Sequence, residues 1–300
     1  MRTQFTGCGT ALVTPFTSSG AIDDAALRRL VRRQVEAGID FLVPCGTTGE
    51  SPTLSFDEKR HIVSLVVDEV AGRVPVLAGA GGYDTREVVA LATAFHALGV
   101  QGFLSVTPYY NKPTPQGLIE HYRAIAAATP LPIVLYNVPG RAGTNIDVAT
   151  LAKLAAIPGV IGVKEASGNM MQIAEVCARL PGDFLVLSGD DAMALPVIAV
   201  GGRGVISVAS NIVPAEMTAL VAAANRGAFD EARAIHARLF DLMQVNFVES
   251  NPIPVKAALA MLGWIGEHYR LPMVPPQSAT KDRIAAVLKA LDLRAAEVAR

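Results

Sequence analysis

The stretch VIGVKEAS at residues 160–167 places a lysine, Lys164, near the end of a short apolar strand. A strand that is apolar at nearly every position is typical of a parallel sheet covered on both faces, where an unpaired ammonium is costly to bury. A lysine made less basic by burial is a nucleophilic amine, the group that forms a Schiff base with a carbonyl substrate. The alternatives are a lysine that pairs with a carboxylate such as Glu165, or one that reaches solvent at the end of its strand.

The same pattern, a short apolar strand followed by a helix, occurs eight times in succession along the chain. The predicted strands are residues 7–13, 41–45, 74–78, 102–107, 133–137, 160–165, 184–188 and 204–209. The predicted helices are residues 23–37, 55–71, 85–98, a helix that begins at Thr114-Pro115, and residues 147–156, 170–180, 192–200 and 214–225.

Eight strand–helix repeats without a change of composition predict an α/β fold, a closed (β/α)8 TIM barrel, over residues 1–225. A doubly wound open sheet is the alternative. Residues 226–300 contain three helical patterns, at 230–247, 254–262 and 281–291, and these predict a helical extension that packs on the barrel.

Composition excludes several classes of protein. The 300 residues are 51% hydrophobic and carry a net charge of -1, which does not fit a nucleic-acid binder, and the absence of an 18-residue apolar run predicts no membrane span. Cys8, Cys45 and Cys177 are odd in number and lack CxxC spacing, which is typical of a cytoplasmic protein. The five histidines have neither HxH nor HExxH spacing, so we expect no metal and no other cofactor.

Polar side chains follow several of the predicted strands, at the C-terminal ends where barrel active sites lie. They belong to GTTGES at 46–51, PYYN at 108–111, YNVPGR at 136–141 and SGDD at 188–191. Each has a structural alternative: a strand–helix turn, packing aromatics, a solvated arginine, or aspartates that cap the next helix. Their convergence with Lys164 at one rim favours a binding site.

Three of these segments suggest particular chemistry. The glycines and threonines of 46–49 bring backbone N–H groups and hydroxyls within reach of a carboxylate. Tyr136 ends an apolar strand, where its phenol could relay protons beside an amine nucleophile. Arg141 is a fixed cation with bidentate geometry for a carboxylate.

Together these motifs resemble the dihydrodipicolinate synthase family, within the pyruvate-dependent lyases that include N-acetylneuraminate lyase. The resemblance spans nearly the whole chain, in matching order, through GTTGES at 46–51, TPYYNKP at 107–113, YNVPGR at 136–141, GVKEASGN at 162–169, LSGDD at 187–191, GVISV at 204–208 and NPIPVK at 251–256.

The resemblance implies a barrel with a C-terminal helical extension and a homotetramer built from tight dimers. It implies that Lys164 forms the Schiff base, that Tyr136 is the general acid and base, and that Thr47 and Tyr110 relay protons, Tyr110 being lent by the neighbouring subunit. It also implies that Thr48 contacts the carboxylate of pyruvate, that Arg141 holds the carboxylate of the second substrate, and that Gly189 and Ile206 line the pocket.

The implied reaction condenses pyruvate with L-aspartate 4-semialdehyde, toward lysine and diaminopimelate. Arg141 after YNVPG favours this branch over the sialic acid lyases, which the resemblance gives an aliphatic residue there. The alternatives are a pyruvate aldolase of 2-keto-3-deoxy sugar acids and a barrel that binds 2-oxo acids without turnover.

One departure from the family concerns feedback control. Relatives that lysine inhibits often carry histidines after GTTGES, and an asparagine and a glutamate near the third strand. Here the matching positions hold Phe56, Lys59, Tyr83 and Glu87. Because the Lys59 cation repels an incoming ammonium and Phe56 offers it no polar partner, we expect weak or absent inhibition by L-lysine.

Overall fold

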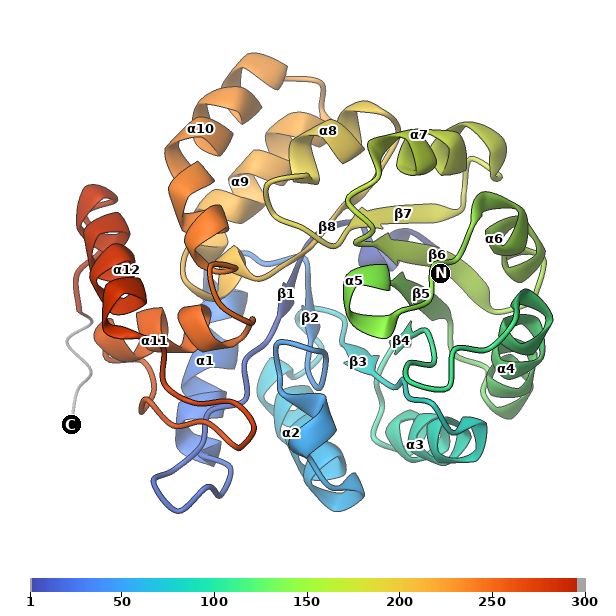
Figure 1. The fold of residues 1–300 in the computed structure, drawn as a ribbon, viewed down its shortest axis with the longest axis horizontal. Helices are drawn as coiled ribbons and strands as arrows, with labels where there is room; N and C mark the ends of the chain where they lie inside the picture. The colour runs from blue at the N-terminus through green and yellow to red at the C-terminus, as the bar shows by residue number, and fades with distance from the viewer. Residues whose placement is uncertain (1, 296–300) are drawn as a thin grey trace.

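Eight parallel strands form the centre of the molecule and lie inside a ring of helices (Figure 1). The computed structural model describes residues 2–295. The strands are β1 (Gly7–Ala11), β2 (Phe41–Val43), β3 (Leu77–Gly79), β4 (Gly102–Val106), β5 (Ile133–Asn137), β6 (Val160–Glu165), β7 (Leu185–Ser188) and β8 (Gly204–Ser207).

The sheet closes into a barrel. Its strand order is β2-β1-β8-β7-β6-β5-β4-β3, and a parallel bridge between Leu42 and Val76 joins the two ends. The N–H of Leu42 donates to the carbonyl of Pro75 (3.0 Å), and the N–H of Gly79 donates to that of Pro44 (2.9 Å). The predicted (β/α)8 barrel is confirmed, and the open sheet is excluded.

The helices that follow the strands are α1 (Asp24–Glu36), α2 (Phe56–Val70), α3 (Thr85–Ala97), α4 (Pro115–Ala128), α6 (Val148–Ala155), α7 (Met170–Arg179), α8 (Ala194–Ala199) and α9 (Pro214–Asn225). Several begin at the residues that the sequence marks as caps. Ser55 and Glu58 form a capping box at α2, and the Thr114 hydroxyl accepts the N–H of Gly117 (3.2 Å) at α4.

The C-terminal extension consists of α10 (Phe229–Val245), α11 (Ile253–Met261) and α12 (Ser278–Ala290), which lie on one side of the barrel (Figure 1). Helix α10 packs along α9, and α12 packs against α10 and α11. The three predicted helical patterns of the extension are thus confirmed, each with bounds shifted by a few residues. Within residues 2–295, none of the helices has the length and apolar character to span a bilayer.

The structure differs from the prediction mainly in the loops and at β3. The third strand, predicted at 74–78, begins only at Leu77, because Pro75 has no N–H to donate and Val76 forms a single bridge to β2 while its own N–H and carbonyl bond to Gln101. Four short helices have too few turns to show a periodic pattern. They are η1 (Arg2–Phe5), η2 (Ser51–Thr53), α5 (Pro139–Ala142) and η3 (Ala209–Asn211).

Two apolar layers explain why the strands read as continuous hydrophobic runs. One layer lies between the sheet and the helices, and the other fills the barrel with side chains such as Phe41, Leu104, Val134 and Ile206. All six residues of β6 are buried, including the lysine near its end. Because successive side chains of a strand point to opposite faces, both layers draw on every strand.

Candidate active site

Lys164 and Tyr136 lie side by side near the ends of two neighbouring strands. They are register partners in the parallel pair β5–β6, and Lys164 Nζ lies 4.3 Å from the centre of the Tyr136 ring. The two residues are only 5% and 6% exposed. The structure thus brings the two predicted residues together, with the amine inside the barrel and next to a phenol.

Glu165, the alternative partner of the lysine, has other contacts. Its carboxylate accepts hydrogen bonds from the amide of Asn137 (3.1 and 3.2 Å) and from the N–H of Ser167 (2.9 Å). Within residues 2–295, no carboxylate forms an ion pair with Lys164. The amine is thus buried without the compensating charge that a structural lysine requires.

Two adjoining cavities open beside this pair, each of about 220 Å³. One contains Lys164, Thr48, Gly189 and Asn251, and the other extends past Tyr109 toward Leu104 and Lys59. Four residues line both cavities, namely Thr47, Tyr136, Val138 and Arg141. The space is large enough for two small substrates, and the amine and the phenol face it.

The loop GTTGES brings Thr47 and Thr48 to this space. Thr48 is buried, and its hydroxyl oxygen accepts a hydrogen bond from the side-chain amide of Asn251 (3.0 Å). Because that bond uses a lone pair of the oxygen, the hydroxyl proton of Thr48 stays available for an acceptor. The loop is tightly turned, since the N–H of Glu50 donates to the carbonyl of Thr47 (3.1 Å).

Arg141 lies on α5, the short helix after β5, and lines both cavities. One of its nitrogens donates to the backbone carbonyl of Asn251 (3.2 Å). The other donors of the guanidinium are free to bind a carboxylate in a bidentate manner. The arrangement fits the predicted anchor of a second, anionic substrate.

Gly189 lies against the lysine. A Cβ at this position would lie 2.6 Å from the Cβ of Ala166 and 3.1 Å from the Cε of Lys164, so only glycine leaves the side chain its place. Ile206, the other predicted lining residue, is fully buried in the same apolar cluster as Tyr136. It supports the site from within the barrel, and it is not among the residues that line the two cavities.

The two tyrosines of the fourth loop differ in position. Tyr109 lines a cavity and packs edge-on against Tyr83, with 5.2 Å between ring centres. Tyr110 is 92% exposed and has a positive φ of 65°. Within one chain the structure therefore brings Tyr109 to the site and directs Tyr110 away from it.

The sequence offers Asp190 and Asp191 as caps of the next helix. Neither caps α8, whose first turn has no side-chain cap. Asp190 accepts the N–H of Ala192 (2.9 Å), and buried Asp191 accepts the N–H groups of Val208 and Ala209 (3.0 and 2.8 Å). Asp191 therefore caps η3, the short helix after β8, which it can reach because β7 and β8 are neighbours in the barrel.

Sequence reasoning missed Asn251 as a site residue, although NPIPVK was one of the motifs. Asn251 contacts both Thr48 and Arg141, which lie 203 and 110 positions before it, too far for a local sequence pattern to connect them. Within residues 2–295, His, Cys, Asp and Glu side chains nowhere gather in threes that could hold a metal ion.

The fold and the site together define a class, the (β/α)8 barrels that carry a buried lysine beside a tyrosine at the C-terminal ends of adjacent strands. The chain belongs to the dihydrodipicolinate synthetase family, whose model matches residues 4–291.

Curated and solved relatives agree with this membership. A 4-hydroxy-tetrahydrodipicolinate synthase of Koribacter versatilis is 55% identical over 93% of this chain and 95% of its own length. The crystal structure of dihydrodipicolinate synthase from Aquifex aeolicus has a TM-score of 0.95 and 44% identity, over 97% of this chain and 99% of that one. The chloride-inhibited enzyme of Acinetobacter baumannii, solved in complex with pyruvate, has a TM-score of 0.94 and 38% identity, over 96% and 99% of the two chains.

Proposed function

We propose that this protein is a Schiff-base-forming lyase that condenses pyruvate with L-aspartate 4-semialdehyde to 4-hydroxy-tetrahydrodipicolinate, in lysine and diaminopimelate biosynthesis. The observation that carries the proposal is the burial of Lys164 beside the Tyr136 ring, at a cavity that Arg141 also lines. The names of the relatives point to the same reaction.

The chemistry begins with the amine. Lys164 Nζ attacks the keto carbon of pyruvate, and loss of water gives an imine, which acidifies the methyl group. The resulting enamine attacks the aldehyde carbon of the second substrate and forms the new C–C bond. The amino group of that substrate then attacks the imine carbon, closes the ring and releases the lysine.

The surrounding residues have distinct tasks. Tyr136 passes protons to and from the developing hydroxyls, with Thr47 and a partner's Tyr110 as relays. Thr48 donates to the carboxylate of pyruvate, since its own oxygen already accepts from Asn251. Arg141 binds the carboxylate of the aldehyde substrate. This chemistry uses only side chains and substrates, so we propose no metal and no organic cofactor.

The assembly and the compartment complete the proposal. Tyr110 can act in catalysis only across a subunit boundary, because it points out of its own chain, and this favours the tight dimer from which we propose that a homotetramer is built. Cys8, Cys45 and Cys177 are free thiols, which supports a cytoplasmic enzyme.

Borohydride trapping tests the central step. We expect pyruvate and borohydride to add a pyruvate-derived mass to one peptide, the one containing Lys164, because reduction makes the imine permanent. In Lys164→Ala the label should be absent, and turnover should fall by several orders of magnitude, on the order of 10⁴-fold or more. A label on another lysine, or an undiminished rate in Lys164→Ala, contradicts the proposal.

The choice of aldehyde tests the reaction itself. A coupled assay that compares L-aspartate 4-semialdehyde with glyceraldehyde separates the proposed enzyme from an aldolase of sugar acids. Trapping without turnover on either aldehyde identifies a protein that binds 2-oxo acids.

A further inference from the structure

A buried ion pair lies behind the loop that carries Thr47 and Thr48. Glu50, in that loop, and Lys256, in α11 of the C-terminal extension, form an ion pair of 2.5 Å between Nζ and Oε1. Their side chains are 1% and 0% exposed. The two residues are 206 positions apart, so the pair connects the extension to the barrel rim.

The surroundings of Lys256 are aromatic. Its Nζ lies 4.4 Å from the centre of the Phe16 ring and 5.1 Å from that of Tyr269. Burial lowers the pKa of Lys256, and the carboxylate of Glu50 opposes that change. A buried ion pair costs desolvation of both ions and adds little net stability, so a geometrical task explains it better than a stabilising one.

That geometry is set at Glu50 itself. Its backbone is in the left-handed region, with φ 55° and ψ 35°, a conformation uncommon outside glycine, asparagine and aspartate. The N–H of Glu50 closes a turn onto the carbonyl of Thr47. Because its side chain is anchored by Lys256, the turn that presents Thr47 and Thr48 to the cavity has one preferred shape.

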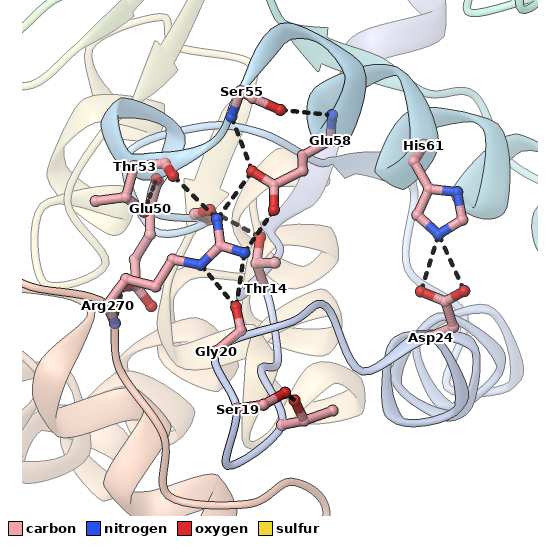
Figure 2. Close-up of polar contacts among 12 residues, drawn as sticks. Thr14, Ser19, Gly20, Asp24, Glu50, Thr53, Ser55, Glu58, His61 and Arg270 are labelled. Carbon is pink, nitrogen blue, oxygen red and sulfur yellow. Dashed lines mark hydrogen bonds and ion pairs between the residues drawn. The ribbon is translucent and has the colours of Figure 1, made fainter.

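Arg270 adds a second attachment to the same loop (Figure 2). Its N–H reaches the second carboxylate oxygen of Glu50 at 3.4 Å, and its guanidinium donates to the carbonyl of Thr53 (3.0 Å) and to both oxygens of Glu58. The loop of residues 46–54 is therefore held from outside at Glu50 and at Thr53.

The same extension reaches the reacting groups through Asn251. Its side-chain amide donates to the hydroxyl of Thr48, and its carbonyl accepts from Arg141. Asn251 lies five residues before Lys256, so the segment that carries the buried lysine also carries both of these contacts.

We propose that Glu50 and Lys256 are positioning residues for pyruvate, through which the C-terminal extension fixes the Thr47–Thr48 loop. The inference rests on the proposed function, and it explains what holds Thr47 and Thr48 in place at the pyruvate site. Arg141 lies on α5, and its contact with the extension is to the backbone carbonyl of Asn251 and not to the ion pair, so recognition of the aldehyde depends less on the pair.

The variants Glu50→Gln and Lys256→Met test this inference. Each keeps the volume of its side chain and removes one charge. We expect the pyruvate KM to rise at least about tenfold and the borohydride trapping of pyruvate to slow in parallel, because a 1 Å misplacement can cost about 10²-fold in rate. The KM for the aldehyde should change by less than about twofold, the ordinary scatter for an unaffected contact.

Lys281→Met is the matched control. Lys281 and Glu267 form another Lys–Glu pair within the extension, at 2.8 Å, but it is about a third exposed and, among the described residues, makes no hydrogen bond to the loop of residues 46–54. This variant should leave both KM values within about twofold of wild type. Wild-type protein that traps pyruvate and turns over L-aspartate 4-semialdehyde tests the proposed function independently of the variants.

Three outcomes overturn the inference. The first is a variant that lowers the melting temperature while the folded enzyme keeps its pyruvate KM. The second is an equal rise of both KM values. The third is failure of both Glu50→Gln and Lys256→Met to fold, since the pair is then a determinant of the fold and not of the loop.

Discussion

At the scale of single residues, the lack of a side chain at Gly189 matters to the site as much as the side chains around it do. Gly189 leaves the space that the Lys164 side chain crosses, and a Cβ there would lie within 3.1 Å of Cε. We expect Gly189→Ala to slow imine formation with pyruvate by roughly tenfold to a hundredfold, because the amine is displaced by a fraction of an ångström to 1 Å. Borohydride trapping at successive times after mixing measures the rate of imine formation.

Gly182→Ala is the control for that change. Gly182 is exposed, and a Cβ there would have no atom within 4 Å. It should leave the trapping rate unchanged. Equal rates in wild type and Gly189→Ala would show that the lysine tolerates the methyl group, and the spatial argument would be wrong.

A second prediction concerns Lys59 and feedback control. Lys59, Phe56 and Glu87 line a cavity of about 310 Å³ beside the site. Burial lowers the pKa of Lys59. The Lys59 ammonium nevertheless lies in the space that the ammonium of L-lysine would have to share, and like charges repel each other. We expect millimolar L-lysine to inhibit wild-type enzyme weakly or not at all, as measured in the coupled assay, and sub-millimolar inhibition contradicts this.

The residues of the site differ in how visible they are in sequence. Lys164 and Tyr136 could be predicted because a polar side chain near the end of an apolar strand is a local signal. Asn251 and Lys256 could not, since their partners Thr48 and Glu50 are more than 200 positions away. The apolar helix pattern around Lys256 indicates that this residue is buried, but it does not indicate which residues surround it. The catalytic roles of the predicted residues stay predictions.

At the scale of elements, the start of α2 combines a local and a distant interaction. The capping box of Ser55 and Glu58 could be predicted from sequence, whereas the ion pair of Glu58 with Arg270 could not (Figure 2). Arg270 lowers the pKa of Glu58 to about 2 from its ordinary 4.5. A depressed pKa stabilises the fold above the ordinary value, and this stability is lost as the pH falls from 4.5 toward 2.

Glu58→Gln tests this pH dependence, since glutamine keeps an oxygen for the capping box. At pH 7 the variant should be less stable by roughly 1 kcal/mol, the upper range for a partly exposed ion pair. The difference should shrink as the pH falls toward 2, when measured by urea unfolding. Asp57→Asn, a change at an exposed neighbour in the same turn, is the control and should matter little. A difference that does not depend on pH contradicts the electrostatic explanation.

At the scale of the whole molecule, the repeat of strand and helix determines the architecture, and so the barrel could be predicted. Parallel strands joined by right-handed crossovers put the C-terminal ends of all the strands at one rim, which is why motifs scattered along the sequence converge there. The contact of the extension with the rim could not be predicted, because it depends on how α11 docks and not on any periodic pattern.

The proposed assembly gives the last prediction, which concerns Tyr110. This side chain is 92% exposed and has a positive φ, so it serves a site only if that site belongs to a neighbouring subunit. Homo-oligomers of Tyr110→Phe should lose roughly 10²-fold in turnover, the lower range for a proton-relay group, and those of Lys164→Ala should be inactive. Co-expression of the two should restore about a quarter of wild-type turnover, because half of randomly paired dimers are mixed and each has one complete site. Turnover no greater than the sum of the two parents would mean that Tyr110 acts within its own chain or not at all.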